Sequence, residues 1–228
     1  MKISTEFSKY ALEYGAYNII QRKVVKKLLD SIKEKPKTIL DLGCGSGAVV
    51  ENIEWEFDHF IGVDFAPGML ELHPKSNKIE SVYGNFNDPS LFEQLQKFCF
   101  DYVISASALQ WADDLDFVFK HIAALNRPVA LAIFTAGTFK TLHKSAGVDS
   151  LLSSASEIKI LQEKYFSDAK FEIVRYSLEF ESVREMFRYI KKSGVSGSRK
   201  ILSYKETKKL MYSYPLNYLE FEVAFIVH

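Results

Sequence analysis

The chain has 228 residues, with 29 basic and 29 acidic side chains, so its formal net charge is zero. General nucleic-acid binders carry an excess of basic residues, so we expect no nucleic-acid partner. Hydrophobic residues make up 47% of the chain, and a chain of this length can bury a full core without disulfides or a structural metal. We therefore expect a single domain over residues 1–228.

The sequence lacks the patterns of a membrane protein and of a metal site. Its longest apolar stretch, residues 129–136, is much shorter than the ~20 residues of a membrane-spanning helix. Charged side chains in the first residues interrupt what would be the apolar part of a secretory signal. Cys44 and Cys99 lack the spacing of a zinc or redox pair. We expect a cytoplasmic monomer with reduced cysteines, no bound metal and no membrane partner.

The first half of the chain alternates predicted helices with short apolar strands. Residues 7–31 place apolar side chains three or four positions apart, which predicts one helix or two. Strands are predicted over 38–40, 59–63, 79–83, 101–105 and 129–135, with helices after the turn at 66–68 and over 90–97 and 114–125. Continuous apolar strands that alternate with helices indicate a parallel sheet covered on both faces.

The second half of the chain is organised differently. Helices are predicted over 138–147, 156–165, 183–193 and 204–212, and an alternating strand over 172–180. Residues 218–227 also alternate apolar and polar side chains, which predicts a strand at the edge of the sheet. From Arg184 to Lys209, nine basic residues stand against two acidic ones, so this segment is strongly basic.

The sharpest local motif follows the first strand, where residues 41–47 read Asp-Leu-Gly-Cys-Gly-Ser-Gly. Glycines allow a tight turn and a close approach of the backbone to a ligand, and the following helix presents free N–H groups. The pattern favours a nucleotide-like ligand but leaves its identity open, because Gly43-x-Gly45-x-x-Ala48 also fits the loose dinucleotide fingerprint. Asp64, at the end of the second strand, would hold ribose hydroxyls in either class.

The segment 41–47 resembles motif I of the class I S-adenosylmethionine-dependent methyltransferases, whose signature is an acidic residue followed by G-x-G-x-G. Asp41 is the residue that separates this motif from the dinucleotide pattern. The resemblance implies an α/β, Rossmann-like fold with a central, mostly parallel seven-stranded sheet and helices on both faces. It also implies S-adenosylmethionine as cofactor and S-adenosylhomocysteine as product, without a metal.

The same resemblance implies roles for individual residues. Asp41 would help to hold the methionine end of the cofactor, and Asp64 would accept hydrogen bonds from the ribose. Phe65 and Met69 would pack on the adenine. Asn85 stands where the family commonly has an acidic residue, and its amide oxygen can accept the same hydrogen bond. The implied cofactor-binding residues are Gln21, Asp41, Gly43, Cys44, Gly45, Gly47, Asp64, Phe65, Met69, Asn85, Phe86 and Ser105.

Further short segments, in the same order along the chain, resemble the malonyl-[acyl-carrier protein] O-methyltransferases of biotin synthesis. They are Phe7-x-x-Tyr10-x-x-x-Tyr14, Gln21-Arg22, Ala108-Leu109-Gln110-Trp111, Phe134-Thr135 with Leu142-His143, residues 188–195, Lys200-Ile201-Leu202 and Tyr214-Pro215-Leu216-x-Tyr218. Where this family commonly has a second glycine, the chain has Lys192 or Ser193, so we expect the backbone to differ there.

This second resemblance implies methyl transfer to the free carboxylate of a malonyl thioester, either malonyl-acyl carrier protein or malonyl-CoA. The product would be the methyl ester that primes pimeloyl synthesis. A carboxylate is already ionised at neutral pH, so we expect no general base and a catalysis that depends on alignment. The alternatives are a methyltransferase for another small carboxylate or metabolite, a nucleotide-binding module without transfer activity, and a nicotinamide-dependent enzyme.

Acceptor binding is expected to use residues from several parts of the chain. Tyr14 would position the reactants, and the substrate-binding candidates are Gln110, Trp111, Arg188 and Arg199. Tyr14 and Trp111 also suit core or lid packing, and Arg188 also suits a solvated helix face. The basic segment would suit an acidic carrier protein. We expect a helical lid over 1–35, a cofactor-binding half over 36–135, and substrate-binding helices with the final strands over 136–228.

Overall fold

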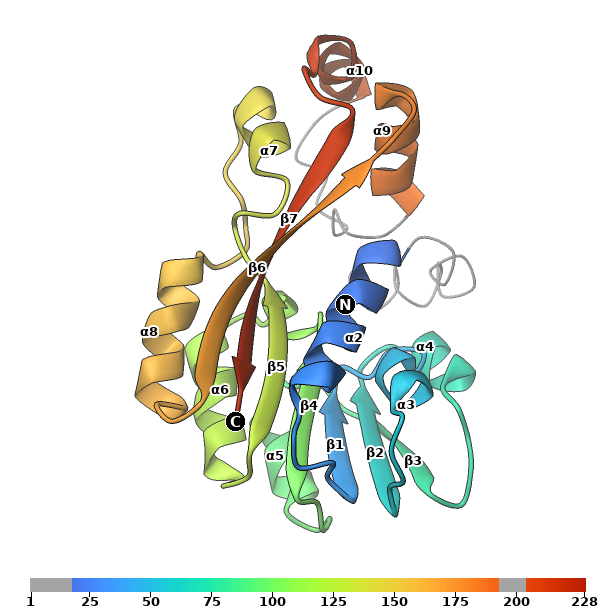
Figure 1. Ribbon diagram of the computed structural model, residues 1–228, viewed down its shortest axis with the longest axis vertical. Coiled ribbons are helices and arrows are strands. Elements are labelled where there is room, and N and C mark those ends of the chain that lie inside the picture. Colours follow the sequence, from blue (N-terminus) through green and yellow to red (C-terminus); the bar gives the residue numbers. More distant parts are fainter. Residues whose placement is uncertain (1–17, 193–203) are drawn as a thin grey trace.

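The computed structural model describes residues 18–192 and 204–228 of the chain (Figure 1). A central sheet carries helices on both faces, and a two-stranded ribbon extends beyond it at one end (Figure 1). The strands are β1 (Thr38–Leu42), β2 (His59–Asp64), β3 (Ile79–Tyr83), β4 (Tyr102–Ala106), β5 (Val129–Phe134), β6 (Lys170–Glu179) and β7 (Tyr218–Val227). The helices are α2 (Ile19–Ser31), α3 (Ala48–Asn52), α4 (Pro67–Leu72), α5 (Pro89–Leu95), the short 3₁₀ helix η1 (Leu109–Trp111), α6 (Leu115–Ala124), α7 (Lys140–Ala146), α8 (Ala155–Tyr165), α9 (Val183–Lys192) and α10 (Tyr204–Ser213).

The sheet has seven strands in the order β3-β2-β1-β4-β5-β7-β6. The first five in this order pair in parallel, and β7 runs antiparallel to both β5 and β6. The predicted mostly parallel, seven-stranded α/β fold is confirmed. Strand order reverses between β1 and β4, so the carboxyl ends of these strands border the crevice in which such sheets bind ligands.

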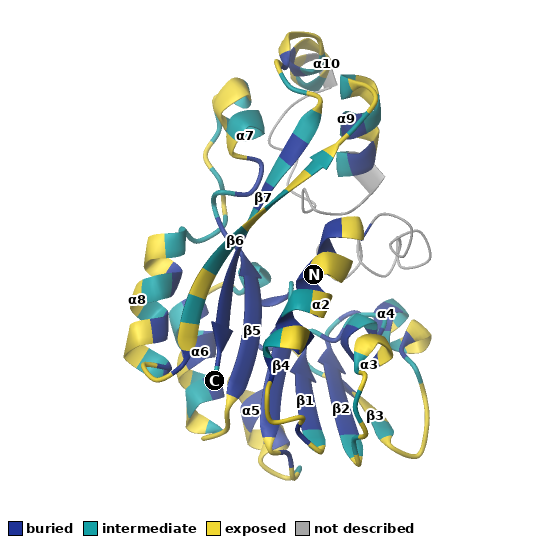
Figure 2. Cartoon of the chain, in the orientation of Figure 1, coloured by how far each residue is buried: buried dark blue, intermediate teal, exposed yellow. Residues whose placement is uncertain are grey.

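Two clusters of buried side chains lie on opposite faces of the sheet, whose central strands are mostly buried (Figure 2). Alternate residues of β1 point to opposite faces, so Ile39 belongs to one cluster and Leu40 to the other. On the first face, Val24 and Leu28 of α2 pack with Ile39. On the second face, α5, α6 and α8 cover the sheet. The strong helical spacing within residues 7–31 is therefore explained, for its described part, by one apolar side of α2.

The prediction that the last strand lies at a sheet edge is wrong. β7 lies between β5 and β6, and β6 forms the edge. Residues Val223 to Val227 of β7 pair with β5 and are all buried, whereas the alternating part, Tyr218 to Glu222, continues past β5 and pairs with β6 alone. Alternation reports which faces of a strand are buried, and it does not report how many neighbours the strand has.

A half-buried glutamate, Glu222, connects the ribbon to the segment that follows β5. Thr135 Oγ1 donates to Glu222 Oε1 at 2.6 Å, and Arg175 Nε pairs with Glu222 Oε2 at 2.8 Å. Two residues earlier in β7, Glu220 Oε2 accepts a hydrogen bond from the backbone N–H of Thr141 at 2.8 Å. These bonds attach the start of α7 to the ribbon. Together, α7, α9 and α10 surround the part of β6 and β7 that lies beyond the sheet (Figure 1).

The other predicted elements are present with shifted ends. The helix predicted over 138–147 spans Lys140–Ala146, and the strand predicted over 172–180 spans Lys170–Glu179. Residues 1–17 of the predicted lid lie outside the described part of the chain. Within the described residues, none of the helices has the length and apolar character needed to cross a membrane.

Candidate functional site

The glycine motif forms the turn between β1 and α3, and two of its glycines are required there. Gly43 has φ +79°, and a Cβ on it would overlap Ala108 Cβ. Gly47 has φ +101°, and a Cβ on it would overlap Pro74 Cδ. Both positions therefore combine a left-handed backbone with a close neighbour, and only glycine meets both conditions without strain. The turn consequently lies tightly against the segments that follow β4 and α4.

Asp64, the last residue of β2, holds this turn in place. Its Oδ2 accepts a hydrogen bond from the backbone N–H of Gly45 at 2.9 Å, and its Oδ1 accepts one from Ala66 N–H at 2.8 Å. Burial raises the pKa of the Asp64 carboxyl, and the hydrogen bonds from the backbone of Ala66, Gly45 and Phe65 partly oppose this rise. Each carboxylate oxygen can accept a further bond, so Asp64 can bind a ligand while it supports the loop.

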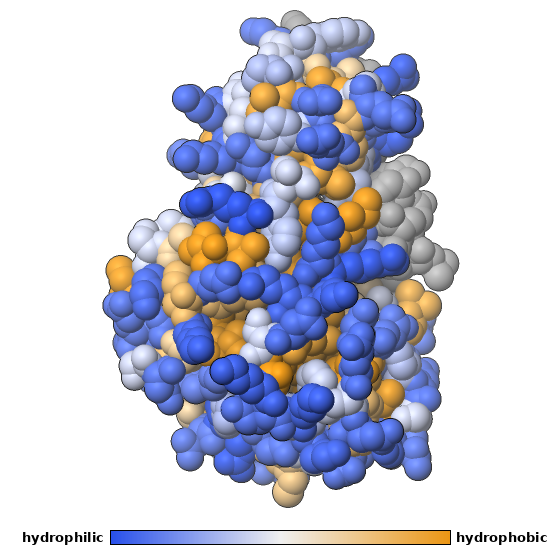
Figure 3. Space-filling view, viewed as in Figure 1, coloured by the Kyte–Doolittle hydropathy of each residue, from blue (hydrophilic) through white to orange (hydrophobic). Residues whose placement is uncertain are grey.

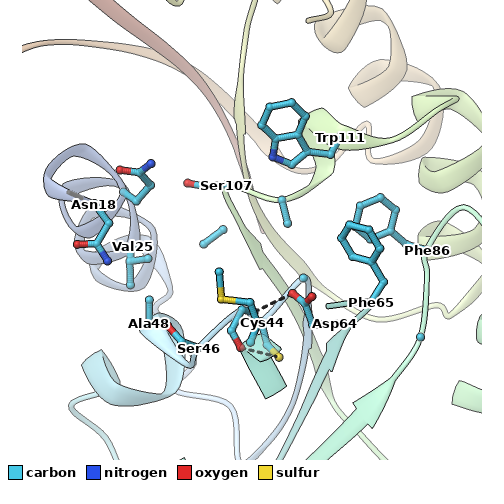
Figure 4. Close-up of a pocket in the computed structure, with 17 residues that line it drawn as sticks. Asn18, Val25, Cys44, Ser46, Ala48, Asp64, Phe65, Phe86, Ser107 and Trp111 are labelled. Carbon is cyan, nitrogen blue, oxygen red and sulfur yellow. Dashed lines mark hydrogen bonds between the residues drawn. The ribbon is translucent and has the colours of Figure 1, made fainter. Parts of the chain in front are cut away.

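A pocket of about 800 Å³, partly open to solvent, lies at this edge of the sheet (Figure 4). Asp64, Phe65 and Phe86 lie on one side of it, and Asn18 and Ser107 lie on the other (Figure 4). The lining residues come from α2, the glycine turn with the start of α3, α4, the ends of β2, β3 and β4, and η1. They are Asn18, Gln21, Val25, Gly43, Cys44, Gly45, Ser46, Ala48, Asp64, Phe65, Met69, Gly84, Phe86, Ala106, Ser107, Ala108 and Trp111.

Several polar groups around the pocket have no hydrogen-bond partner among the described residues. They include Asn18 Oδ1 and Gln21 Oε1 on α2 and Ser107 Oγ after β4. Asn18 is 9% exposed and Gln21 is 8% exposed. A buried polar group without a partner costs about 1–3 kcal/mol, and a bound ligand with matching groups removes this cost. The pocket therefore suits a ligand that brings hydrogen-bonding groups to the side on which Asn18 and Ser107 lie.

Asp41 lies in β1 directly before the glycine turn and is fully buried. Neither of its carboxylate oxygens has a partner among the described residues. Burial, and then the nearby charge of Asp64, raise the pKa of Asp41 well above its usual range. Asp41 does not line the pocket, so its predicted contact with the cofactor stays a prediction.

Cys44 lines the pocket, and its thiol is buried. Burial raises the pKa of this thiol, with smaller contributions from Asp41 and Asp64, so it is a poor nucleophile at neutral pH. Behind it, a Cβ on Gly62 would stand 2.9 Å from both Cys44 Sγ and His73 Nε2. Cys44 therefore serves as an apolar wall, packed between the pocket and strand β2.

Most of the predicted cofactor-binding residues meet in this pocket. Those that line it are Gln21, Gly43, Cys44, Gly45, Asp64, Phe65, Met69 and Phe86, together with the substrate candidate Trp111. Gly47, Ser105 and Asn85 do not line it. Ser105 Oγ donates to the Leu42 carbonyl at 2.6 Å, and Asn85 Oδ1 accepts from the Asn87 backbone N–H at 3.0 Å. In this structure Ser105 therefore joins β4 to β1, and Asn85 shapes the loop after β3.

The predicted acceptor residues are spread more widely. Gln110 lies behind the lining and donates from Nε2 to the Ser107 carbonyl at 2.6 Å. Arg188 is exposed on α9 and does not line the pocket. Tyr14 and Arg199 lie outside the described residues. The roles assigned to these four residues stay predictions.

The sequence reasoning missed several lining residues, among them Asn18, Val25, Ser46, Ala48, Ser107 and Ala108. For α2 a signal was available, because Asn18, Gln21 and Val25 are three and four positions apart and so share one side of a helix. The sequence gave no such signal for Ser107, because its position depends on a left-handed backbone that a serine does not predict. No group of three metal-ligating side chains occurs among residues 18–192 and 204–228.

Comparisons with known proteins identify the class of this fold. Residues 40–131, which contain the glycine turn and four of the pocket-bearing strands, match the family model described as "Methyltransferase domain". YcgJ from Bacillus subtilis has the same fold, with a TM-score of 0.61 at 12% identity over 92% of this chain and 98% of that one. Phosphoethanolamine N-methyltransferase 2 from Haemonchus contortus, solved with S-adenosylhomocysteine, gives a TM-score of 0.55 at 16% identity, over 96% of this chain and 57% of that one. The fold is that of a Rossmann-like methyltransferase.

Sequence relatives narrow this class. The malonyl-[acyl-carrier protein] O-methyltransferase of Acetivibrio thermocellus is 31% identical over 226 aligned residues, which cover 87% of this chain and 79% of the relative. The enzyme of the same name from Brevibacillus brevis is 25% identical over 95% of this chain and 92% of its own length. The chain belongs to the family of S-adenosylmethionine-dependent methyltransferases that contains these malonyl-[acyl-carrier protein] O-methyltransferases.

Proposed function

We propose that this chain transfers a methyl group from S-adenosylmethionine to the free carboxylate of a malonyl thioester. The observation that carries the proposal is the likeness to the Acetivibrio thermocellus enzyme over 87% of the chain, joined to a pocket that suits the cofactor. The methyl ester formed would prime pimeloyl synthesis for biotin. This role is the one that the family resemblance of the sequence implies.

The pocket suits the cofactor at both of its ends. Asp64 presents a carboxylate to ribose hydroxyls, and Phe65, Met69 and Phe86 offer apolar surface to the adenine. On the other side, the unpartnered amide oxygens of Asn18 and Gln21 can accept hydrogen bonds from the ammonium group of an amino acid. When bound, S-adenosylmethionine supplies an electrophilic methyl group on its sulfonium.

The charge of the pocket supports a cationic cofactor. Among the described lining residues Asp64 is the one charged side chain, and the Asp41 carboxyl lies behind the same turn. A negative charge on Asp64 favours a sulfonium over an anionic ligand. A bound acceptor carboxylate would lose the hydration that slows its attack, because much of this pocket is apolar.

The reaction requires no proton transfer by side chains of this protein. A carboxylate oxygen of the acceptor forms the new bond to the methyl carbon while the carbon–sulfur bond breaks, and the bonding electrons stay with sulfur. No proton moves, and both charges are neutralised. The chain therefore has to align the two reactants and exclude water, and it needs no general base.

The proposal includes an acyl carrier protein as the preferred bearer of the malonyl group. Exposed basic side chains occur on both α9 and α10, which pack against each other at the end of the molecule beyond the sheet. Hydrophilic side chains crowd the outer surface of this end (Figure 3). Carrier proteins are acidic, and such a surface would steer them toward the pocket.

The direct test is mass spectrometry of malonyl-carrier protein after incubation with the enzyme and S-adenosylmethionine. We expect a gain equal to one methylene unit that is lost in the Asp64→Ala variant. No gain with the unsubstituted enzyme, while S-adenosylhomocysteine still binds in calorimetry, would refute the malonyl acceptor. The search would then move to other small carboxylates. Binding of NAD in place of S-adenosylhomocysteine would refute the cofactor.

A further inference from the structure

Ser107 has an unusual backbone for a serine. It follows β4 directly and has φ +61°, in the left-handed region that side chains other than glycine, asparagine and aspartate rarely adopt. Its N–H donates to the Ala132 carbonyl at 2.9 Å, and its carbonyl accepts from Gln110 Nε2 at 2.6 Å. Two neighbours thus hold the strained residue in one conformation.

The hydroxyl of Ser107 points to a use for this strain. Ser107 lines the pocket, and its Oγ is buried without a hydrogen-bond partner among the described residues. Strained residues that persist under support cluster at functional sites. A serine that bears both backbone strain and an unpartnered buried hydroxyl is costly unless the hydroxyl meets a ligand.

The position of Ser107 indicates which ligand group it meets. In Figure 4 Ser107 lies on the side of the pocket opposite Phe65 and Phe86, and the indole of Trp111 lies farther out. With the adenosine at the Asp64 end, as the proposed function requires, the methyl group and its acceptor meet near Ser107. The described lining offers an acceptor carboxylate no basic side chain, whereas the unpartnered Ser107 hydroxyl is a neutral donor.

We propose that Ser107 positions the methyl acceptor by donating a hydrogen bond from its hydroxyl to a carboxylate oxygen. The inference rests on the proposed function. A neutral donor orients the carboxylate but leaves it more nucleophilic than an ion pair with an arginine would. An ion pair would be weakened when the carboxylate loses its charge on methylation, and a neutral donor avoids this cost.

A purely structural explanation exists, and it makes a different prediction. The left-handed backbone of Ser107 brings Ala108 directly onto Gly43, and this contact alone could require the conformation. If only the backbone mattered, glycine would serve better than serine at position 107, because glycine adopts this conformation without strain.

The test compares Ser107→Ala, which keeps the strain, with Ser107→Gly, which relieves it. We expect both variants to raise the KM for malonyl-CoA by about ten- to a hundredfold, the loss of a hydrogen bond to a charged group. The dissociation constant for S-adenosylhomocysteine, measured by calorimetry, should stay within about twofold of the unsubstituted value. Ser31→Ala, whose hydroxyl bonds to the Lys27 carbonyl at the end of α2, is the matched control and should keep both constants.

Two results would overturn the inference. Ser107→Gly with an unchanged KM would leave only the structural role. An equal loss of affinity for S-adenosylhomocysteine in both variants would assign the hydroxyl to the cofactor instead. Absence of methyl transfer to malonyl-CoA and to malonyl-carrier protein by the unsubstituted enzyme is a separate result, which refutes the proposed function and this role for Ser107 with it.

Discussion

The Asp64 carboxylate accepts a hydrogen bond from the Gly45 backbone N–H at 2.9 Å, so the end of β2 holds the glycine turn that follows β1. One side chain therefore has two tasks, because Asp64 shapes the loop and also faces the pocket. Any change at this position acts on the walls of the pocket and on its charge together.

We expect Asp64→Asn to weaken the binding of S-adenosylhomocysteine by about a hundredfold, although asparagine has nearly the same shape. Both carboxylate oxygens accept backbone N–H groups, and an amide would turn a donor toward one of them and leave it unpaired. Calorimetry gives the dissociation constant. Asp149→Asn, a neutralisation at an exposed site, is the control. Unchanged binding in Asp64→Asn would show that the carboxylate is not required.

Asp41→Asn should stabilise the ligand-free protein and weaken cofactor binding. The carboxyl is fully buried without a partner, and a neutral amide of the same shape removes the cost of burying a charge. We expect a gain of about 1–3 kcal/mol in the free energy of unfolding at neutral pH, measured with urea. An unchanged or lower stability would mean that the carboxylate has a stabilising partner in the folded chain.

The same residue predicts a pH dependence. Burial raises the pKa of Asp41 in the folded state above 3.8, its usual value, which applies to the unfolded state. Between the unfolded-state pKa and the raised folded-state pKa, the folded state binds more protons than the unfolded state. The contribution of Asp41 to stability is therefore greatest in acid and is lost as the pH rises through this window. Urea unfolding at several pH values should show that Asp41→Asn removes this loss. Parallel pH curves for the two proteins would contradict the assignment.

Two glycines of the turn should respond differently to alanine. A Cβ on Gly43 would overlap Ala108, whereas a Cβ on Gly45 has no atom within 4 Å. We expect Gly43→Ala to lower the stability by about 2 kcal/mol or more, and Gly45→Ala by about 1 kcal/mol. Gly45 lines the pocket, so its alanine variant should bind S-adenosylhomocysteine at least about tenfold more weakly.

Gly147 provides the control for this pair. It has φ +65° after α7, its Cβ would also meet no atom within 4 Å, and it lies away from the pocket. Gly147→Ala should therefore match Gly45→Ala in thermal stability and keep full affinity for the ligand. Equal ligand affinity in the two variants would contradict a role of the Gly45 position in binding.

Charge reversal on α9 and α10 should affect malonyl-carrier protein and malonyl-CoA differently as substrates. We expect Arg184→Glu combined with Lys208→Glu to raise the KM for malonyl-carrier protein by about tenfold and to leave the KM for malonyl-CoA unchanged. The effect should shrink in high salt, because exposed charges are screened. The double reversal Lys97→Glu with Lys120→Glu, at exposed sites near α5 and α6, is the control. Equal effects on both substrates would exclude carrier docking at this surface.

Sequence alone determined the five parallel strands and the glycine turn beside the pocket. Apolar strands, glycine turns and an acidic residue at the end of a strand are local patterns, and in a parallel sheet the carboxyl ends of neighbouring strands must meet at one edge. Phe65, Met69 and Phe86 therefore line the same pocket as Gly43 and Gly45 of the turn, as expected.

Only the tertiary structure decided the remaining features. β7 lies inside the sheet because it pairs with β5 and β6. The alternation of apolar and polar residues along β7 does not reveal how many strands pair with it. Asn18 reaches the pocket because α2 packs across the sheet, more than twenty residues before the glycine turn. Ser107 reaches it through a left-handed backbone held by Ala132 and Gln110. Sequence patterns report local conformation and burial, whereas these three positions depend on contacts between distant segments, which only the folded chain brings together.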